Sequence, residues 1–411
     1  MVAIPIRTRV ATSLGSLASA ASRRLGRGDG SVIGGRVALA VDPGALAALA
    51  GDRATALVSG TNGKTTTTRL LADAVRSRGP VVTNATGANL PSGIVSTLGA
   101  AGPGTAAVLE VDERYVPRVA PVLRPATLVL LNLSRDQLDR YGEVRSVSDL
   151  WRRAVAELPA TRVIANADDP LVVWGAGTAA AVTWVGAGLE WREDAVGCPS
   201  CSGPIRWDDD GSWHCASCSS RRPPLDVRLE GDDLVLADGS RTTLALALPG
   251  RANRANAAMA AAAAVPMGVA LADAAAAMAG TTEVAGRYRT VQVGQTTARL
   301  LLAKNPAGWQ ELFDLLRPAP LPVVVCINAR DADGRDTSWL WDVPFERLRE
   351  RPVVASGERC HDIGVRLQYA DVDHTVEPDL LDAVRAAGRE VDVVANYTAF
   401  QALRARLGRA A

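Results

Sequence analysis

The stretch that decides the fold is Ser59-Gly60-Thr61-Asn62-Gly63-Lys64-Thr65-Thr66. It follows an apolar run at 54–58 and precedes a helical pattern at 67–76. A strand, a glycine-rich turn ending in Lys-Thr, and a helix are together typical of a phosphate-binding loop. In such a loop the backbone N–H groups and the helix N-terminus face the anion. The pattern predicts that Lys64 reaches the terminal phosphates of a nucleotide and that the Thr65 hydroxyl binds Mg²⁺.

Lysine is scarce in this chain, which draws attention to the loop. Of the 45 Lys and Arg residues, only Lys64 and Lys304 are lysines. A guanidinium is too broad and flat for a position that a compact ammonium fills. Residue 58 is valine, so the loop has the shorter G-x-x-G-K-T spacing and not the common G-x-x-x-x-G-K-[ST] spacing. The alternative is a glycine turn with a solvated lysine, which the flanking strand and helix patterns disfavour.

Length and composition set the class of protein. A chain of 411 residues with 48% hydrophobic residues is expected to form two or three domains with real cores. The net charge of +1 gives no field that would attract nucleic acid. The sequence contains neither an apolar run of transmembrane length nor a signal peptide, which predicts a cytoplasmic protein. The N-terminal segment is expected to be an amphipathic helix packed on the next domain. Contact with the inner membrane surface stays open as an alternative.

The pattern along the chain indicates α/β architecture. Residues 1–50 are expected to form a helical lead-in and a short strand at Val37–Val41. Residues 51–290 are expected to form the nucleotide-binding domain. Strands and helices alternate in residues 51–195 and predict a parallel sheet with helices on both faces. Residues 291–411 predict a second α/β domain. The candidate strands of this second domain are 299–302, 323–327, 352–355, 370–372 and 391–394.

Two C-x-x-C elements, Cys198/Cys201 and Cys215/Cys218, lie in an insertion at about 196–222. Each element can present two thiolates to one tetrahedral ion, and this spacing predicts a structural Zn²⁺ site in a zinc ribbon. Four thiolates leave no open coordination position, so the metal is expected to stabilise and not to catalyse. A pair of disulfides is the alternative, and a reducing cytosol disfavours it. A redox role for the two elements is also disfavoured.

Further stretches occur in the order in which Mur ligases carry their motifs. They are Leu109–Glu113, Leu131–Tyr141, Asn166–Pro170, Gly250–Ala257 and Gly286–Arg287. With the phosphate loop, they resemble the Mur ligase family of ATP-dependent enzymes. The resemblance implies that the residues from Gly60 to Thr66 bind ATP, that Lys64 is also catalytic, and that Glu110 joins Thr65 at Mg²⁺. It also implies that Asn256 contacts the adenine and that Arg287 belongs to the ATP site.

Departures from the family pattern narrow the expectation. Gln137 stands where those ligases usually have a metal-binding histidine. Residues 151–160 contain no lysine, although the family carries a carbamylated lysine there. The residues before position 50 are too few for a UDP-binding domain. The chain is therefore not expected to be an ordinary amino-acid-adding Mur ligase.

One branch of the family fits better. The four-cysteine insertion together with Leu302–Trp309 and Asn328–Asp342 resembles the MurT family, the synthetase subunits of lipid II isoglutaminyl synthase. That resemblance implies ATP-dependent amidation of the α-carboxylate of D-glutamate in the lipid II stem peptide. An acyl phosphate would be attacked by ammonia from a GatD-type glutaminase partner in a heterodimer, in peptidoglycan synthesis.

The resemblance also implies that this chain lends an aspartate to the Cys-His pair of the glutaminase. Asp342 and Asp336 are the candidates, and Asp342 is favoured because it ends the tryptophan-rich segment 338–341. The alternative is that either aspartate caps a helix beginning near Pro344. Cys360 and His361 are neighbours in sequence, and we expect an ordinary cysteine and a surface histidine rather than a catalytic dyad.

Other interpretations stay open at this point. Lys304 follows a predicted strand and either binds a phosphate or substrate carboxylate or forms a structural ion pair. For the whole chain, the alternative functions are a folylpolyglutamate-type or cyanophycin-type amino-acid ligase and a nucleotide-regulated zinc scaffold without chemistry.

Overall fold

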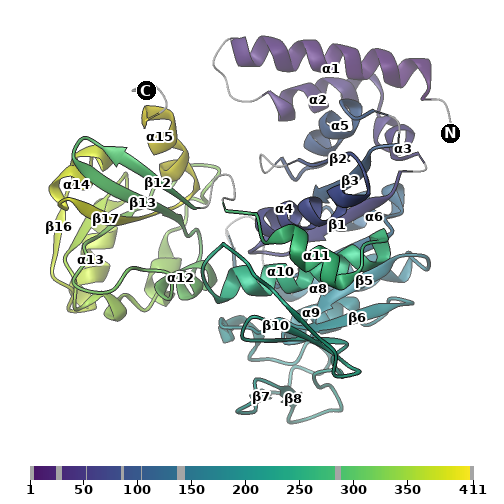
Figure 1. Cartoon of the computed structure of the whole chain (residues 1–411). Coiled ribbons are helices and arrows are strands. Elements are labelled where there is room, and N and C mark those ends of the chain that lie inside the picture. Colours follow the sequence, from purple (N-terminus) through teal and green to yellow (C-terminus); the bar gives the residue numbers. More distant parts are fainter. Residues whose placement is uncertain are drawn as a thin grey trace. The chain divides into compact units, whose positions relative to one another are not determined.

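The computed structural model describes residues 4–24, 30–51, 53–84, 88–102, 104–136, 144–282 and 288–407. The chain divides into two compact units, a first unit of residues 1–133 and 145–282 and a second unit of residues 134–144 and 283–411 (Figure 1). The predicted fold class is confirmed, because each unit is built on a mainly parallel α/β sheet and the first carries the four-cysteine insertion. Within the described residues, no helix combines the length and apolar character needed to cross a membrane.

The first unit is organised around a central buried strand. Its main sheet contains β1 (Thr55–Ser59), β2 (Val81–Val82), β3 (Ala106–Glu110), β4 (Thr127–Leu130), β5 (Arg162–Asn166), β6 (Val182–Gly186), β9 (Val227–Glu230), β10 (Asp233–Leu236) and β11 (Arg241–Thr243). The spatial order is β11-β10-β9-β6-β5-β4-β1-β3-β2, and only the β9-β10-β11 end is antiparallel. Every residue of β1 is buried between β3 and β4. Ligands of such sheets bind beyond the carboxyl ends of the strands, where the phosphate loop lies.

Helices cover both faces of this sheet. They are α4 (Lys64–Val75), α5 (Pro91–Gly99), α6 (Val116–Leu123), α8 (Val144–Ala156), α9 (Pro170–Ala176), α10 (Arg251–Ala264) and α11 (Leu271–Met278), with short 3₁₀ turns η1 (Arg76–Arg78), η2 (Glu193–Ala195) and η3 (Val265–Met267). Helices α4, α10 and α11 pack together. Right-handed crossovers place α5, α6, α8 and α9 on the opposite face. The alanine-rich run 257–264 of α10 is fully buried, so its small side chains let α10 lie close to α4.

The regular structure described in the N-terminal region consists of helices, namely α1 (Ile6–Arg24), α2 (Ser31–Val41) and α3 (Ala45–Ala50). The predicted strand at Val37–Val41 is therefore wrong, because these residues form the last turns of α2. A short apolar run does not by itself distinguish a buried helix from a strand. Two glycines of α2 allow it to pack closely against α1 and α5. A Cβ on Gly34 would lie 2.6 Å from the Gly15 carbonyl oxygen of α1, and a Cβ on Gly35 would lie 1.6 Å from the Ser92 carbonyl oxygen of α5.

The second unit has its own sheet, β12 (Tyr288–Val293), β13 (Thr296–Leu302), β14 (Val323–Cys326), β15 (Val353–Ser356), β16 (His374–Val376) and β17 (Glu390–Ala395), in the order β12-β13-β17-β14-β15-β16. Its helices are α12 (Pro306–Phe313), α13 (Cys360–Tyr369), α14 (Leu380–Ala386) and α15 (Tyr397–Leu407), with 3₁₀ turns η4 (Ser338–Asp342) and η5 (Phe345–Leu348). Separate apolar cores, one around Trp309 and Phe345 and one around Phe400, stabilise it.

One strand of the second unit was placed wrongly from the sequence. The predicted strand at 370–372 is a turn after α13, and the strand itself begins at His374. Asp371 has a left-handed φ of 54°, which extended backbone does not allow.

Candidate functional site

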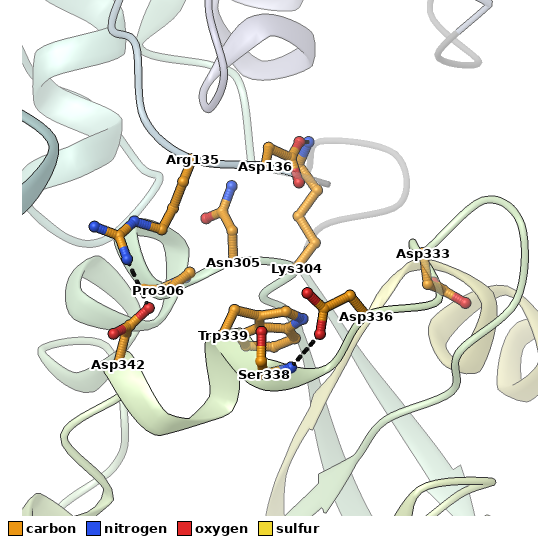
Figure 2. Close-up of a pocket in the computed structure, with 10 residues that line it drawn as sticks. All are labelled: Arg135, Asp136, Lys304, Asn305, Pro306, Asp333, Asp336, Ser338, Trp339 and Asp342. Carbon is orange, nitrogen blue, oxygen red and sulfur yellow. Dashed lines mark hydrogen bonds and ion pairs between the residues drawn. The ribbon is translucent and has the colours of Figure 1, made fainter. Parts of the chain in front are cut away.

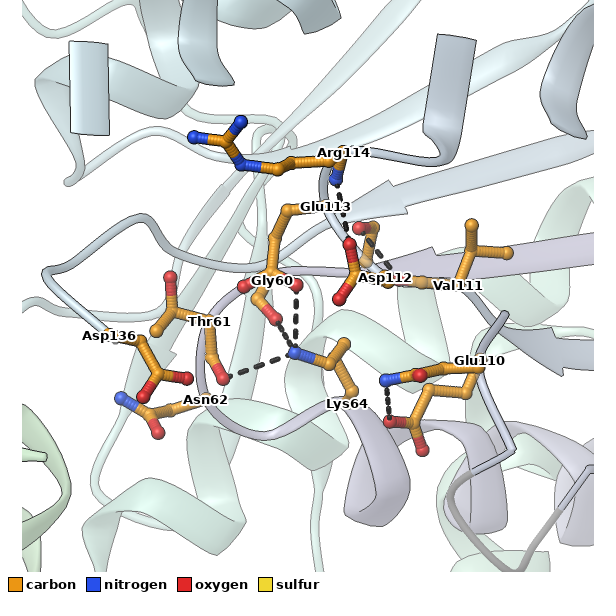
Figure 3. Close-up of polar contacts among 12 residues, drawn as sticks. Gly60, Thr61, Asn62, Lys64, Glu110, Val111, Asp112, Glu113, Arg114 and Asp136 are labelled. Carbon is orange, nitrogen blue, oxygen red and sulfur yellow. Dashed lines mark hydrogen bonds and ion pairs between the residues drawn. The ribbon is translucent and has the colours of Figure 1, made fainter. Parts of the chain in front are cut away.

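The phosphate loop joins the carboxyl end of β1 to the start of α4 (Figure 3). Gly63 precedes the helix with φ of 85°, a conformation that glycine adopts without steric cost. Helix α4 begins at Lys64, so its first backbone N–H groups, which have no partner within the helix, are directed into the loop. This arrangement suits an anion such as a phosphate.

Lys64 lies inside the loop and is only 4% exposed. Its Nζ donates to the Thr61 carbonyl at 3.2 Å and to the Glu113 carboxylate at 3.0 Å, and it also contacts the Gly60 carbonyl (Figure 3). A buried ammonium is costly unless it is paired, and these oxygens supply the pairing. The cation is therefore held where the loop would receive a phosphate.

A pair of oxygen ligands lies beside the loop. The Thr65 hydroxyl donates to Glu110 Oε2 at 2.8 Å. Glu110 ends β3 and is 3% exposed, and Asn89 donates to its other carboxylate oxygen at 3.3 Å. Asn84 fixes the Glu110 backbone by bonding both its N–H and its carbonyl, each at 2.8 Å. Mg²⁺ prefers hard oxygen ligands such as this hydroxyl and carboxylate, so the two residues fit a magnesium site.

Two asparagines from other parts of the first unit contact the phosphate loop and the first turn of α4. The Asn256 amide oxygen of α10 accepts from the Thr67 hydroxyl at 3.2 Å and would lie 2.3 Å from a Cβ on Gly63. Asn132, which follows β4, accepts the Asn62 backbone N–H at 2.9 Å and returns a bond to the Asn62 carbonyl at 3.1 Å. The structure thus brings Asn256 to the loop, whereas Arg287 and Gln137 lie outside the described residues.

The four cysteines of the insertion converge. Their sulfur atoms lie within 4.8 Å of one another, with Cys198 and Cys218 3.7 Å apart and Cys201 and Cys215 3.5 Å apart. Zn–S bonds of about 2.3 Å in a tetrahedron put the sulfurs roughly 3.8 Å apart, so this donor set fits Zn²⁺. The small hairpin of β7 (Ile205–Trp207) and β8 (Trp213–Cys215) holds the second element. All of these cysteines are free, in contrast to the disulfide alternative.

A polar pocket lies in the second unit. It is lined by Arg135, Asp136, Lys304, Asn305, Pro306, Asp333, Asp336, Ser338, Trp339 and Asp342 (Figure 2). Lys304 reaches toward Asp136 and forms an ion pair with it, which is one of the two alternatives left open for this lysine. Asp342 Oδ2 accepts from the Arg135 guanidinium at 2.9 Å.

The two candidate aspartates have different surroundings. Asp336 accepts the Ser338 backbone N–H at 2.8 Å at the start of η4, and this hydrogen bond lowers the pKa of Asp336. Asp342 is the last residue of η4, and its side chain is 40% exposed. The turn after Pro344 has no side-chain cap, so the capping role proposed for these aspartates near that residue is wrong.

The two remaining cysteines, Cys326 and Cys360, are buried in the second unit. Cys326 ends β14, and burial raises the pKa of its thiol to about 12. Cys360 is buried at the first residue of α13, whereas His361 beside it is exposed. No cysteine–histidine hydrogen bond occurs among the described residues.

Sequence reasoning missed two residues of the loop. Glu113 forms an ion pair with Lys64, and the Asn132 side chain accepts a hydrogen bond from the Asn62 backbone N–H. Both lie in stretches that carried the family resemblance, but nothing in their spacing indicated which side chains would turn toward the loop.

Comparison with known proteins finds similarity to Mur ligases in the region of the phosphate loop and to MurT proteins along most of the chain. A model of the Mur ligase middle domain matches residues 58–193, and one of the MurT ligase C-terminal domain matches residues 302–400. The MurT subunit of lipid II isoglutaminyl synthase (glutamine-hydrolysing) from Streptococcus pneumoniae R6 is 33% identical over 392 residues, covering 87% of this chain and 86% of that protein. The Staphylococcus aureus N315 subunit of the same name is 28% identical, with 98% of each chain covered.

A solved structure supports the same fold. The pseudomurein peptide ligase type C from Methanothermus fervidus matches with a TM-score of 0.67 and 17% identity, covering 88% of this chain and 79% of that protein. At this identity the likeness concerns the fold alone.

Proposed function

The chain belongs to the MurT family, and on this premise we propose that it is the ATP-dependent subunit that amidates the α-carboxylate of D-glutamate in lipid II. At the coarser level it is a Mur-type ligase of peptidoglycan synthesis. A carboxylate oxygen attacks the γ-phosphorus of ATP and ADP leaves. The ammonia nitrogen then attacks the acyl carbon, phosphate leaves, and the nitrogen loses a proton to give the amide of D-isoglutamine.

The phosphate loop is the observation that carries this proposal. A carboxylate is a poor electrophile, and phosphorylation supplies its leaving group. Phosphoryl transfer depends mainly on positioning and on charge neutralisation. Lys64 supplies one fixed cation, and Thr65 with Glu110, 2.8 Å apart, would hold Mg²⁺. When bound, the metal ion would neutralise further phosphate charge. Asn256 is placed at the same loop, where we assign it to the nucleotide base.

Ammonia must come from outside this chain. A glutaminase nucleophile is a reactive thiolate next to a base. Cys326 has its pKa raised to about 12 by burial, Cys360 is buried, and the other four cysteines cluster with one another. We therefore assign glutamine hydrolysis to a GatD-type partner subunit, which agrees with the word subunit in the names of the relatives.

A surface next to Asp342 suits that partner. Trp341 is 54% exposed and Tyr369 is 73% exposed, and their rings meet edge to face at 5.3 Å. Exposed aromatic side chains are enriched at protein interfaces. Asp342 follows Trp341 directly and remains partly exposed, so it can reach a histidine of the partner after exchanging its contact with Arg135. Asp336 is bound to its own backbone turn, which favours Asp342 for this role.

The experiment compares nitrogen donors. The purified chain receives Mg-ATP and lipid II with ammonium, with glutamine, or with free amino acids. Amide formed with ammonium alone supports the proposal, and glutamine should replace ammonium only when the glutaminase is added. Product formed only with an amino acid would instead indicate an amino-acid ligase. No turnover with any donor would indicate a scaffold.

A further inference from the structure

Helix α1 of the first unit exposes its large apolar residues and buries small or polar ones. A helix that only packs on its own domain normally does the reverse. Its buried residues are small or polar, namely Thr8, Ala11, Gly15, Ser19 and Ser22. Their spacing of three or four residues places them on one face of the helix. This face meets α2, where the glycine contact described above allows the two backbones to approach closely. The contact between α1 and α2 therefore contains none of the large apolar side chains of α1.

The large apolar residues of α1 point the other way. Ile6 is 79% exposed, Val10 49%, Leu14 42% and Leu17 67%. With 3.6 residues per turn, these positions fall within a stripe of roughly 80° that lies opposite the buried face. A continuous apolar stripe of this kind on a surface marks an interaction site.

The charges around the apolar stripe indicate what kind of partner binds it. The first 28 residues contain five arginines and no aspartate or glutamate. Arg7 and Arg9 border the apolar stripe, and Arg23 and Arg24 end the helix, all of them exposed. A helix with an apolar stripe bordered by arginines is typical of one that lies in the interface of a bilayer with anionic lipids. A partner protein would need an apolar groove flanked by acidic side chains. An anionic bilayer offers both features, because its acyl chains are apolar and its headgroups are negatively charged.

We propose that α1 lies in the plane of an anionic lipid bilayer, with its apolar stripe among the upper acyl chains and with Arg9 and Arg24 at the lipid phosphates. This binding surface is separate from the ATP loop and does not depend on the proposed amidation. It would bring the chain to the kind of surface on which a lipid-linked substrate resides.

Vesicle flotation tests the proposal on the full chain without nucleotide or substrate. The chain should float with vesicles of phosphatidylglycerol and phosphatidylcholine and only weakly with phosphatidylcholine alone. The double variant Val10→Ser/Leu17→Ser should bind roughly tenfold more weakly, because it removes two apolar side chains from the stripe. The matched control Val196→Ser/Val265→Ser changes two residues of similar exposure, 61% and 50%, and should bind as the unchanged chain does.

A charge variant gives an independent readout. Arg9→Gln/Arg24→Gln should weaken binding to anionic vesicles and reduce its dependence on salt. Circular dichroism checks that each variant is folded. The proposal is overturned if the unchanged chain does not bind anionic vesicles or if the stripe and control variants bind equally. It is also overturned if sedimentation shows a dimer that only the stripe variant loses, because the stripe would then be an interface between copies. The ammonium-dependent ligase assay is run separately, so either proposal can fail alone.

Discussion

Replacing Gly63 with alanine should damage nucleotide binding far more than the backbone conformation alone explains. An alanine with left-handed φ costs about 1 kcal/mol. At Gly63 the new Cβ would also lie 2.3 Å from Asn256 Oδ1, which must retreat by about 1.1 Å to reach an ordinary contact of 3.4 Å. That retreat breaks the bond from the Thr67 hydroxyl, worth about 1 kcal/mol. The total loss of unfolding free energy is therefore about 2 kcal/mol.

Gly239 provides a matched control. Its φ is 83°, close to the 85° of Gly63, but nothing lies within 4 Å of the Cβ position. Gly239→Ala should cost only about 1 kcal/mol and leave ADP affinity unchanged. Gly63→Ala should weaken ADP binding at least roughly tenfold, because a shift of about 1 Å in a positioning residue is costly. Urea unfolding and calorimetric titration with ADP measure both quantities. Equal effects of the two substitutions on stability and affinity would refute the reasoning.

Three further predictions concern other parts of the chain. Cys215→Ser should reduce bound zinc from one ion per chain and make the insertion sensitive to protease, whereas Ser217→Ala should not; metal analysis showing no zinc in the unchanged chain would contradict the site. Burial raises the pKa of Cys326 to about 12, above its ordinary value near 9, so the buried neutral thiol stabilises the fold at neutral pH and this contribution is lost as pH rises. The unfolding free energy should therefore fall by about 1 kcal/mol between about pH 8 and about pH 10, and Cys326→Ala should remove this component; an unchanged pH dependence in the variant would count against it. With the glutaminase present, Asp342→Asn should abolish glutamine-dependent amidation and keep ammonium-dependent amidation, while Asp336→Asn should keep both; the reverse pattern would show that the choice of aspartate is wrong.

Local patterns explain why the core of the first unit was predictable. The apolar strand, the glycine turn and the Lys-Thr pair follow each other without a gap, so the sequence predicts β1, the loop and the start of α4 directly. The cysteine spacing likewise predicts the four-sulfur cluster, because each C-x-x-C turn brings its own two sulfurs together.

Long-range contacts explain what was not predictable. Arg135 and Asp342 are 207 residues apart in sequence, and no local pattern indicates their pairing. Of the two glutamates near the end of β3, Glu110 meets Thr65 and Glu113 meets Lys64, a division that depends on how the chain turns after the strand. The segment Val37–Val41 was misassigned because its helical form depends on close packing at Gly34 and Gly35.

Isotope transfer from the substrate tests the central claim most directly. Lipid II carrying heavy oxygen in the α-carboxylate of D-glutamate is incubated with the chain, Mg-ATP and ammonium. Activation by phosphorylation predicts that each amide formed is accompanied by one ADP and one inorganic phosphate that contains a single heavy oxygen. Amide formed without heavy oxygen in the phosphate, or ATP cleaved to AMP, would contradict the account.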